Sequence, residues 1–332
     1  SMLAFHRLVE RPKIGRGLVL GLVLATTGLA CGYYGLFVGL MVGVAIIFFA
    51  TTKRLWTNTS YWTAIGLAVI TGGLVTGIAF VPYLEVAETH GAITRTLDEA
   101  RVYSADWQSY LASPARSHRW ILDRIEVWNE VLFPGFLTLG LAAVGLTALR
   151  RPTGTAPTCP AVTTDAPRSL SPIVALYGLL ALLAWWASLG PAGGLYTVLF
   201  ETVPGFGMLR APGRFGIVVA LGLSVLAGVG VTRLARGRRT VAVTTTLVLA
   251  ALVELAAVPY PHHEAPRFPA AYQMLAQLPP GPVAEFPYFN RRMEYPRHSY
   301  YLVGSTTHWR PLVNGYSDLI PQDFRAEADD LA

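Results

Sequence analysis

The residues best suited to chemistry lie in the stretch 200–215, which leads directly into a long apolar run. This stretch carries two arginines, Arg210 and Arg214, and one carboxylate, Glu201. A guanidinium group at the depth of lipid headgroups can hold a phosphate through forked hydrogen bonds. It can equally anchor the start of a helix, with its stem in the bilayer and its charge at the surface. The stretch therefore predicts either a lipid-phosphate site or a helix anchor.

Three further carboxylates lie inside or beside long apolar runs. Glu254 is the only ionisable residue well inside such a run, and a carboxylate in a bilayer is costly enough to be a functional candidate. Because it lies near the end of its run, an ion pair with an arginine explains it equally well. Glu85 and Glu88 follow another apolar run, where paired carboxylates could act as general bases, hold a divalent metal ion or lie in solvent.

Aromatic residues beside hydrogen-bonding groups suit carbohydrate, because sugar rings stack on aromatic faces and sugar hydroxyls need donors and acceptors. Residues 299–317 gather such groups, including His308 and Asn314, although the interior of a small domain has the same composition. Trp107 could stack on a sugar or anchor the chain at the bilayer surface. No phosphate-loop, dinucleotide, nucleophile-elbow or zinc motif occurs in the sequence, so we predict no cofactor and leave open only a divalent metal ion.

The composition of the chain predicts that lipid surrounds most of it. Of its 332 residues, 53% are hydrophobic and only 14% are charged, which lies outside the usual range of soluble domains. The apolar residues come in long blocks, and about 20 apolar residues in a helix cross a bilayer. The net charge of +6 is scattered over the loops, which argues against nucleic-acid binding. We therefore expect an all-α polytopic transmembrane bundle with membrane lipids as its surroundings.

Seven apolar segments define the expected bundle, each bounded by Pro, Gly, Trp, Tyr or Arg. The expected spans cover residues 17–31, 33–51, 61–83, 131–148, 172–189, 214–234 and 241–260. The uncharged run 17–51 is too long for one span at ordinary tilt, so its two halves form a hairpin that turns at 32–35. Residues 1–260 are thus expected to form a transmembrane domain of about seven helices.

The basic residues predict the side of the membrane on which each loop lies. Seven spans divide the loops into two alternating sets. One set holds 13 Lys and Arg against 2 Asp and Glu, and it consists of 1–16, 52–60, 150–171 and 233–240. By the positive-inside rule this set is cytoplasmic, which places the N-terminus in the cytoplasm and makes 150–171 a flexible cytoplasmic linker. The loops 84–130 and 190–213 are then outside the membrane.

The last segment, 261–332, is expected outside the membrane with partial α/β structure. Apolar spacing predicts helices at 270–278 and 294–303, and 283–286 is a short strand candidate. Roughly 70 residues with one strand make a poor independent core. We therefore expect the segment to be incomplete and the chain to be a fragment of a longer protein.

Two motifs carry a resemblance to a known family. They are Pro-Gly-Phe, Leu-Arg-Ala-Pro and Arg-Phe within 204–215, and the run His-Trp-Arg-Pro-Leu-Val-Asn-Gly-Tyr-Ser at 308–317. With them, nearly the whole chain resembles bacterial polytopic membrane proteins of the GT-C glycosyltransferase-like superfamily, including protein-mannosyltransferases and proteins that glycosylate envelope polymers. The resemblance implies a place in the bacterial cytoplasmic membrane and sugar transfer from a polyprenyl-phosphate carrier to an acceptor on the outer face. It also implies Arg210 and Arg214 as contacts of the donor phosphate.

The chain departs from that family in its first outer loop. Members usually carry a catalytic Asp or Glu there, whereas the loop 32–35 has no carboxylate. Either the catalytic segment lies upstream of Ser1 in a longer parent, or the chain is a relative without transferase activity, so no catalytic residue carries over. The leading hypothesis is a membrane glycosyltransferase acting on an envelope polymer or protein. The alternative is a noncatalytic scaffold or transporter component whose outer domain binds envelope glycans.

Overall fold

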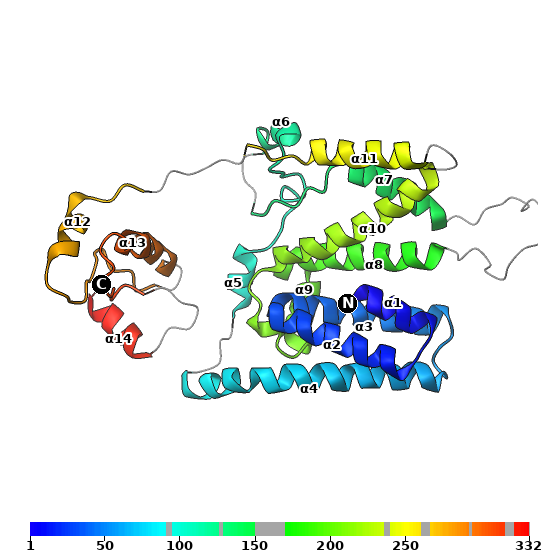
Figure 1. Cartoon of the computed structure of the whole chain (residues 1–332), viewed down its shortest axis with the longest axis horizontal. Helices are drawn as coiled ribbons and strands as arrows, with labels where there is room; N and C mark the ends of the chain where they lie inside the picture. The colour runs from blue at the N-terminus through cyan, green and yellow to red at the C-terminus, as the bar shows by residue number, and fades with distance from the viewer. Residues whose placement is uncertain are drawn as a thin grey trace, which may run out of the picture. The chain divides into compact units, whose positions relative to one another are not determined.

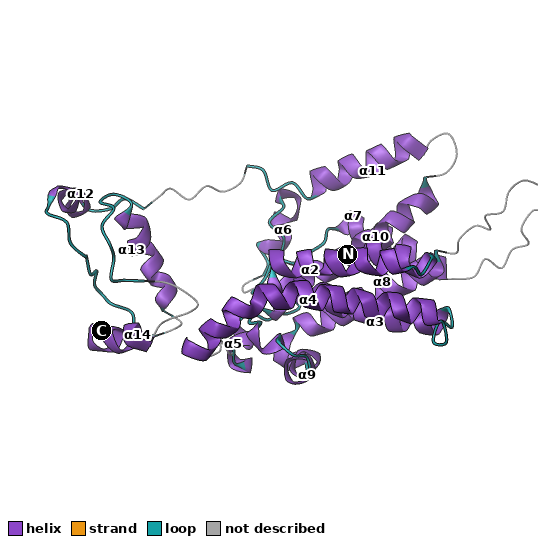
Figure 2. Ribbon diagram, turned by 60° about the horizontal axis from the view of Figure 1, so that its bottom comes forward, coloured by secondary structure: helices purple, strands orange, loops and turns teal. Residues whose placement is uncertain are grey.

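The computed structural model describes residues 1–90, 95–125, 129–149, 170–235, 240–259, 266–291, 294–315 and 322–331. Across these ranges the chain is mostly helical and contains no strand (Figures 1 and 2). By its internal contacts it divides into two compact units. Unit 1 is Ser1–Pro82 with Thr94–Pro259, and unit 2 is Tyr83–Ile93 with Tyr260–Ala332. The expected all-α bundle is confirmed, whereas the linker predicted at 150–171 lies almost wholly outside the described residues.

Apolar helices supply the body of unit 1. Those long and apolar enough to cross a membrane, within the described ranges, are the four helices α3 (Gly32–Thr52), α4 (Thr59–His90), α8 (Ser171–Ser188) and α10 (Gly216–Leu234). Three shorter apolar helices are α2 (Ile14–Ala30), α7 (Phe136–Leu146) and α11 (Thr240–Glu254). Each of the seven predicted spans falls on one of these helices, but helix length supports only four crossings. A count of seven crossings stays a prediction.

Glycines let the helices of unit 1 approach closely. A Cβ atom added at Gly145 of α7 would overlap the carbonyl oxygen of Leu226 and lie 2.9 Å from its carbonyl carbon in α10. The reverse contact is equally tight, since a Cβ at Gly230 of α10 would overlap the carbonyl oxygen of Leu141 in α7. Close backbone packing at small residues is typical of helices that associate in membranes, where no hydrophobic force drives them together.

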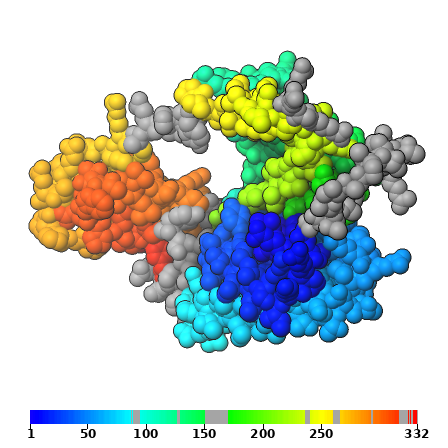
Figure 3. All heavy atoms as spheres, turned by 45° about the vertical axis from the view of Figure 1, so that its right-hand side comes forward, coloured from blue at the N-terminus to red at the C-terminus, as the bar shows by residue number. Residues whose placement is uncertain are grey.

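The N-terminal helix α1 (Met2–Glu10) is amphipathic and turns its apolar face inward. Phe5 and Leu8 are fully buried in the main core of unit 1, which also holds Tyr61, Tyr196 and Phe206. Figure 3 shows α1 to α4, coloured blue to light blue, as one continuous surface on this face of unit 1. The predicted division of 17–51 into two packed helices is confirmed, but the turn predicted at 32–35 is wrong, because α2 ends and α3 begins on either side of Cys31 and 32–35 form the first turn of α3.

The two long loops predicted outside the membrane fold into short helical turns at one end of the bundle (Figure 1). The first loop contains α5 (Leu97–Val102), η1 (Arg116–His118) and α6 (Arg119–Leu122). The second contains η3 (Gly190–Gly193), α9 (Leu195–Thr202), η4 (Phe206–Met208) and η5 (Pro212–Phe215). A backbone hydrogen bond of 3.0 Å from Gly213 N to the Tyr103 carbonyl ties the second loop to the first. These loops position the site described below.

Unit 2 is helical in its described part, with α12 (Ala270–Gln277), η7 (Tyr295–Arg297), α13 (His298–Ser305) and α14 (Gln322–Leu331). The helices predicted at 270–278 and 294–303 are present. The strand predicted at 283–286, and with it the partial α/β structure, is wrong for the described residues, because only an isolated parallel bridge joins Val283 to Leu312. Pro282 and Pro287 flank this segment and Pro311 lies opposite. Pro311 has no N–H to donate on one side of the bridge, and on the other side the N–H of Glu285 donates to the Asn314 side chain instead of the facing backbone.

Candidate functional site

Two arginines meet around one tyrosine at the loop end of unit 1. The guanidinium of Arg214 lies over the ring of Tyr33, with its Cζ 4.3 Å from the ring centroid. The backbone N–H of Arg210 donates to the hydroxyl of the same Tyr33 at 2.8 Å, and its guanidinium lies 5.5 Å from the ring centroid of Tyr103. Cations over aromatic faces are attracted by the ring quadrupole. Both arginines were predicted from the sequence, and in the structure Tyr33 contacts the guanidinium of one and the backbone of the other.

The loop that carries the arginines is fixed by buried aromatic residues. Phe206 and Phe215 lie on either side of the arginine pair in sequence, are both buried, and approach each other with ring centroids 6.2 Å apart. The hydroxyl of the fully buried Tyr196 donates to the Leu209 carbonyl at 2.9 Å. In contrast to this buried support, Arg214 is exposed and Arg210 is half-buried. Buried aromatic residues therefore hold the backbone of this loop in place, while the side chain of Arg214 is exposed to solvent.

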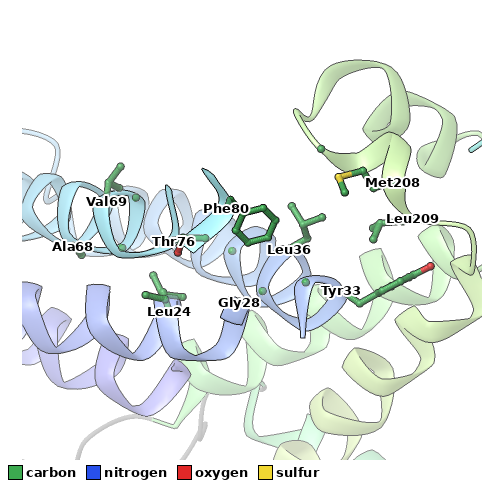
Figure 4. Close-up of a pocket in the computed structure, with 17 residues that line it drawn as sticks. Leu24, Gly28, Tyr33, Leu36, Ala68, Val69, Thr76, Phe80, Met208 and Leu209 are labelled. Carbon is green, nitrogen blue, oxygen red and sulfur yellow. The ribbon is translucent and has the colours of Figure 1, made fainter. Parts of the chain in front are cut away.

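An apolar cavity of about 500 Å³ begins at the same tyrosine. Its walls come from α2, α3, α4 and the loop 205–209, and their polar surface is small. Figure 4 shows it extending from Leu24 and Val69 at one end to Tyr33, Met208 and Leu209 at the other. Glycines on all three helices keep the cavity open, because a larger residue there would fill it. Tyr33 thus belongs both to the cavity wall and to the arginine pair.

Glu130 is a member of this site that the sequence did not indicate. A Cβ atom on Gly213 would lie 2.7 Å from Glu130 Cγ and 3.0 Å from its Oε1, so the side chain passes directly over the backbone beside Arg214. Burial raises the pKa of the Glu130 carboxyl, and the positive charge of Arg214 offsets part of that rise. Glu130 and Arg214 are far apart in sequence, and only the fold brings them together.

Glu254 pairs with a histidine and caps a helix, which fits the structural alternative offered by the sequence with a histidine in place of an arginine. Its Oε1 lies 3.1 Å from Nε2 of His118, and its two oxygens accept the backbone N–H groups of Phe136 and Leu137 at the start of α7. His118 is 1% exposed and its Nδ1 contacts the Ser113 hydroxyl at 2.8 Å. A carboxylate at a helix N-terminus satisfies free N–H groups and the helix dipole.

Four other predicted residues lie apart from the arginine pair in sequence and in role. Glu201 is exposed near the end of α9, and Trp107 is 68% exposed in the first loop. Glu85 and Glu88 are exposed on the last turns of α4, in the part that belongs to unit 2. A catalytic or binding role for these four residues stays a prediction.

His308 and Asn314 are buried in unit 2 and stabilise its backbone. Asn314 is 0% exposed, and its amide accepts the N–H of Glu285 at 2.6 Å while donating to the Glu285 carbonyl at 2.8 Å. His308 Nδ1 accepts the backbone N–H of Arg310 at 3.0 Å. Both side chains therefore serve the interior of a small domain, which is the alternative that the sequence had left open.

The arrangement in unit 1 combines two chemistries. Its cavity suits a hydrocarbon chain, and the arginine pair at the cavity end suits an anion. Across the described ranges, no group of three or more His, Cys, Asp or Glu residues is placed to hold a metal ion. Comparison with protein families, with curated proteins and with solved structures finds no match for this chain.

Proposed function

We propose that this chain is a membrane glycosyltransferase-like protein that takes a sugar from a polyprenyl-phosphate donor and transfers it to an envelope polymer or protein. The observation that carries the proposal is the double role of Tyr33, which lines the apolar cavity, stacks under the Arg214 guanidinium and accepts the backbone N–H of Arg210. A polyprenyl phosphate has the matching form, with a long hydrocarbon chain that ends in an anion. One molecule can therefore fill the cavity and reach the guanidinium groups at once.

The energetics favour such a ligand over a soluble anion. Burying apolar surface contributes about 25 cal/mol per Å², so a chain in the cavity of unit 1 adds affinity that a free sugar phosphate lacks. A hydrogen bond to a charged group contributes about 1.5–3 kcal/mol. Arg214 is exposed and so retains donors that can reach a ligand, while stacking on Tyr33 limits the entropy lost when they do so.

The proposal includes a topology. The shorter helices α2, α7 and α11 also cross the membrane, which gives seven spans with the N-terminus in the cytoplasm of a bacterium and the arginine site on the outer face. The clustering of basic residues supports this orientation. The 17 residues of α2 span about 25 Å at 1.5 Å per residue, close to the hydrocarbon thickness of a bilayer.

A second candidate function is a noncatalytic scaffold or transporter component that binds envelope glycans through unit 2. It is favoured by Trp309, which is 82% exposed and has a φ of 53°, a backbone conformation that favours glycine. Residues in strained backbone conformations cluster at binding and active sites, and here the strained residue exposes a large aromatic ring. Its exposed ring could stack on a sugar.

The two candidates predict different results with the full chain in proteoliposomes that contain a polyprenyl-phosphate-linked radiolabelled sugar and an envelope polymer fraction. Transferase activity moves the label from the lipid fraction to the polymer in a time-dependent manner. The scaffold retains polymer on the vesicles and leaves the label in the lipid. Retention that is lost in Trp309→Ala, without any transfer by the unsubstituted chain, would refute the transferase proposal.

A further inference from the structure

Glu130 is held in place by the loop before it. Its backbone N–H donates to the Ser109 hydroxyl at 3.2 Å, and that hydroxyl donates in turn to Asp106 Oδ1 at 2.6 Å. Two residues further on, Leu132 N donates to the Ser109 carbonyl at 2.9 Å. The backbone around Glu130 therefore has a fixed place at the outer end of unit 1.

Its side chain faces the arginine loop across Gly213. Gly213 is buried, and its N–H donates to the Tyr103 carbonyl at 3.0 Å, which fixes the loop under the Glu130 carboxylate. Only a residue without a Cβ leaves room for the carboxylate there, because Cδ and Oε1 of Glu130 would both lie 3.0 Å from an added Cβ. The next residue, Arg214, supplies a positive charge that acts on Glu130.

Glu130 is therefore a half-buried carboxylate beside the group that we assign to the donor phosphate. A side chain of this kind has a clear use in sugar transfer, because an acceptor hydroxyl is a weak nucleophile until a base removes its proton. The sugar carbon that is attacked is bonded to the phosphate oxygen, so a base must lie close to the phosphate-binding group. No other role for the Glu130 carboxylate, such as a helix cap, is provided by its described contacts.

We propose that Glu130 is the general base that takes the proton of the acceptor hydroxyl in unit 1. This inference rests on the proposed function. The acceptor O–H bond breaks as its proton passes to a Glu130 carboxylate oxygen, and the acceptor oxygen forms a bond to the anomeric carbon. The bond from that carbon to the phosphate oxygen breaks, and its electron pair stays on polyprenyl phosphate beside Arg210 and Arg214. The proton then leaves Glu130 to solvent, which restores the carboxylate.

The electrostatics of the site suit this role. Burial raises the pKa of Glu130, which strengthens the carboxylate as a base, and the positive charge of Arg214 offsets part of that rise. Among the described residues, the charged and titratable groups that contacts place around Glu130 are Arg214 on the facing loop, Asp106 behind Ser109, and Tyr103, whose carbonyl accepts the Gly213 N–H. The rate of transfer should rise with pH as Glu130 loses its proton, through a range above the ordinary pKa of a glutamate.

The test is the pH profile of transfer by Glu130→Gln and Glu130→Asp in proteoliposomes, with binding of polyprenyl phosphate measured in parallel. We expect Glu130→Gln to lower the transfer rate by about 10²–10⁴-fold, the usual contribution of a general base, and to abolish the rise with pH. Glu130→Asp should retain that rise at a reduced rate. Both variants should bind polyprenyl phosphate at least as well as the unsubstituted chain, because the removed or shortened carboxylate repels an anion. Glu201→Gln, an exposed carboxylate on α9, is the matched control and should change neither rate nor binding.

The possible failures are distinguishable. If the unsubstituted chain transfers sugar and Glu130→Gln keeps both its rate and its pH dependence, then Glu130 is not the base while the proposed function stands. If Glu130→Gln loses binding of polyprenyl phosphate together with transfer, the carboxylate only positions Arg214 and the base proposal is overturned. If the unsubstituted chain neither binds the lipid nor transfers sugar, the proposed function itself is refuted.

Discussion

Replacing both Arg210 and Arg214 with alanine is expected to abolish binding of polyprenyl phosphate and all sugar transfer. Each arginine contributes a hydrogen bond to a charged ligand, which is worth about 1.5–3 kcal/mol. Each single substitution should therefore weaken binding by about tenfold to a hundredfold, and the two together by the product of these factors or more. Affinity for the lipid phosphate in nanodiscs, measured at one fixed salt concentration, checks this.

A lysine substitution separates charge from geometry at the same position. Arg214→Lys keeps the positive charge but loses the planar fork and its stacking on Tyr33, so it should restore only part of the binding lost in Arg214→Ala. Arg101→Ala is the matched control, because Arg101 lies in the first loop of the same unit and is paired with Asp98. Binding that survives in the double alanine variant, with the fold intact, would remove the arginines from the site.

The second large effect is expected at the contact between α7 and α10. Gly145→Leu should lower the stability of unit 1 by about 3 kcal/mol or prevent folding, because overpacking of a close contact is costly and a Cβ there overlaps the Leu226 carbonyl oxygen. Gly140→Leu on the same helix is its control, since a Cβ at Gly140 meets nothing within 4 Å. Thermal unfolding followed by size-exclusion chromatography in detergent measures both.

The same comparison is available on the partner helix. Gly230→Leu in α10 should be as damaging as Gly145→Leu, whereas Gly228→Leu should be tolerated because its Cβ meets open space. Equal stability of the tight and open variants would show that α7 and α10 do not pack through these glycines.

The sequence predicted the features that depend on neighbouring residues. Apolar run length located the helices of the bundle, because an apolar segment in lipid must satisfy its own backbone hydrogen bonds. Arg210 and Arg214 were predicted as one site because both lie in the short stretch 200–215. Helix length was harder to predict, because residues 131–135, which hydropathy alone assigned to a span, form a loop before α7.

Features that depend on distant residues were missed or misread. In the sequence Glu130 is one of many acidic residues in a long loop. Only the fold, which places its side chain over Gly213 and beside Arg214, makes it a candidate site residue. For Glu254 the sequence offered a functional role or a structural ion pair, but it did not indicate the partner, His118, which no sequence spacing links to it. The apolar cavity is also absent from any local pattern, because its wall residues come from separate helices and a loop.

The most direct test of the central claim is photolabelling of the full chain with a photoreactive polyprenyl phosphate, followed by mapping of the labelled peptides. We predict adducts on α2, α3, α4 and the loop 205–209, at cavity residues such as Leu24, Val69 and Met208. Unlabelled polyprenyl phosphate should compete for these adducts, the uncharged polyprenol should compete poorly, and the double arginine variant should not be labelled there. Adducts confined to other helices, or equal competition by polyprenol, would contradict the account.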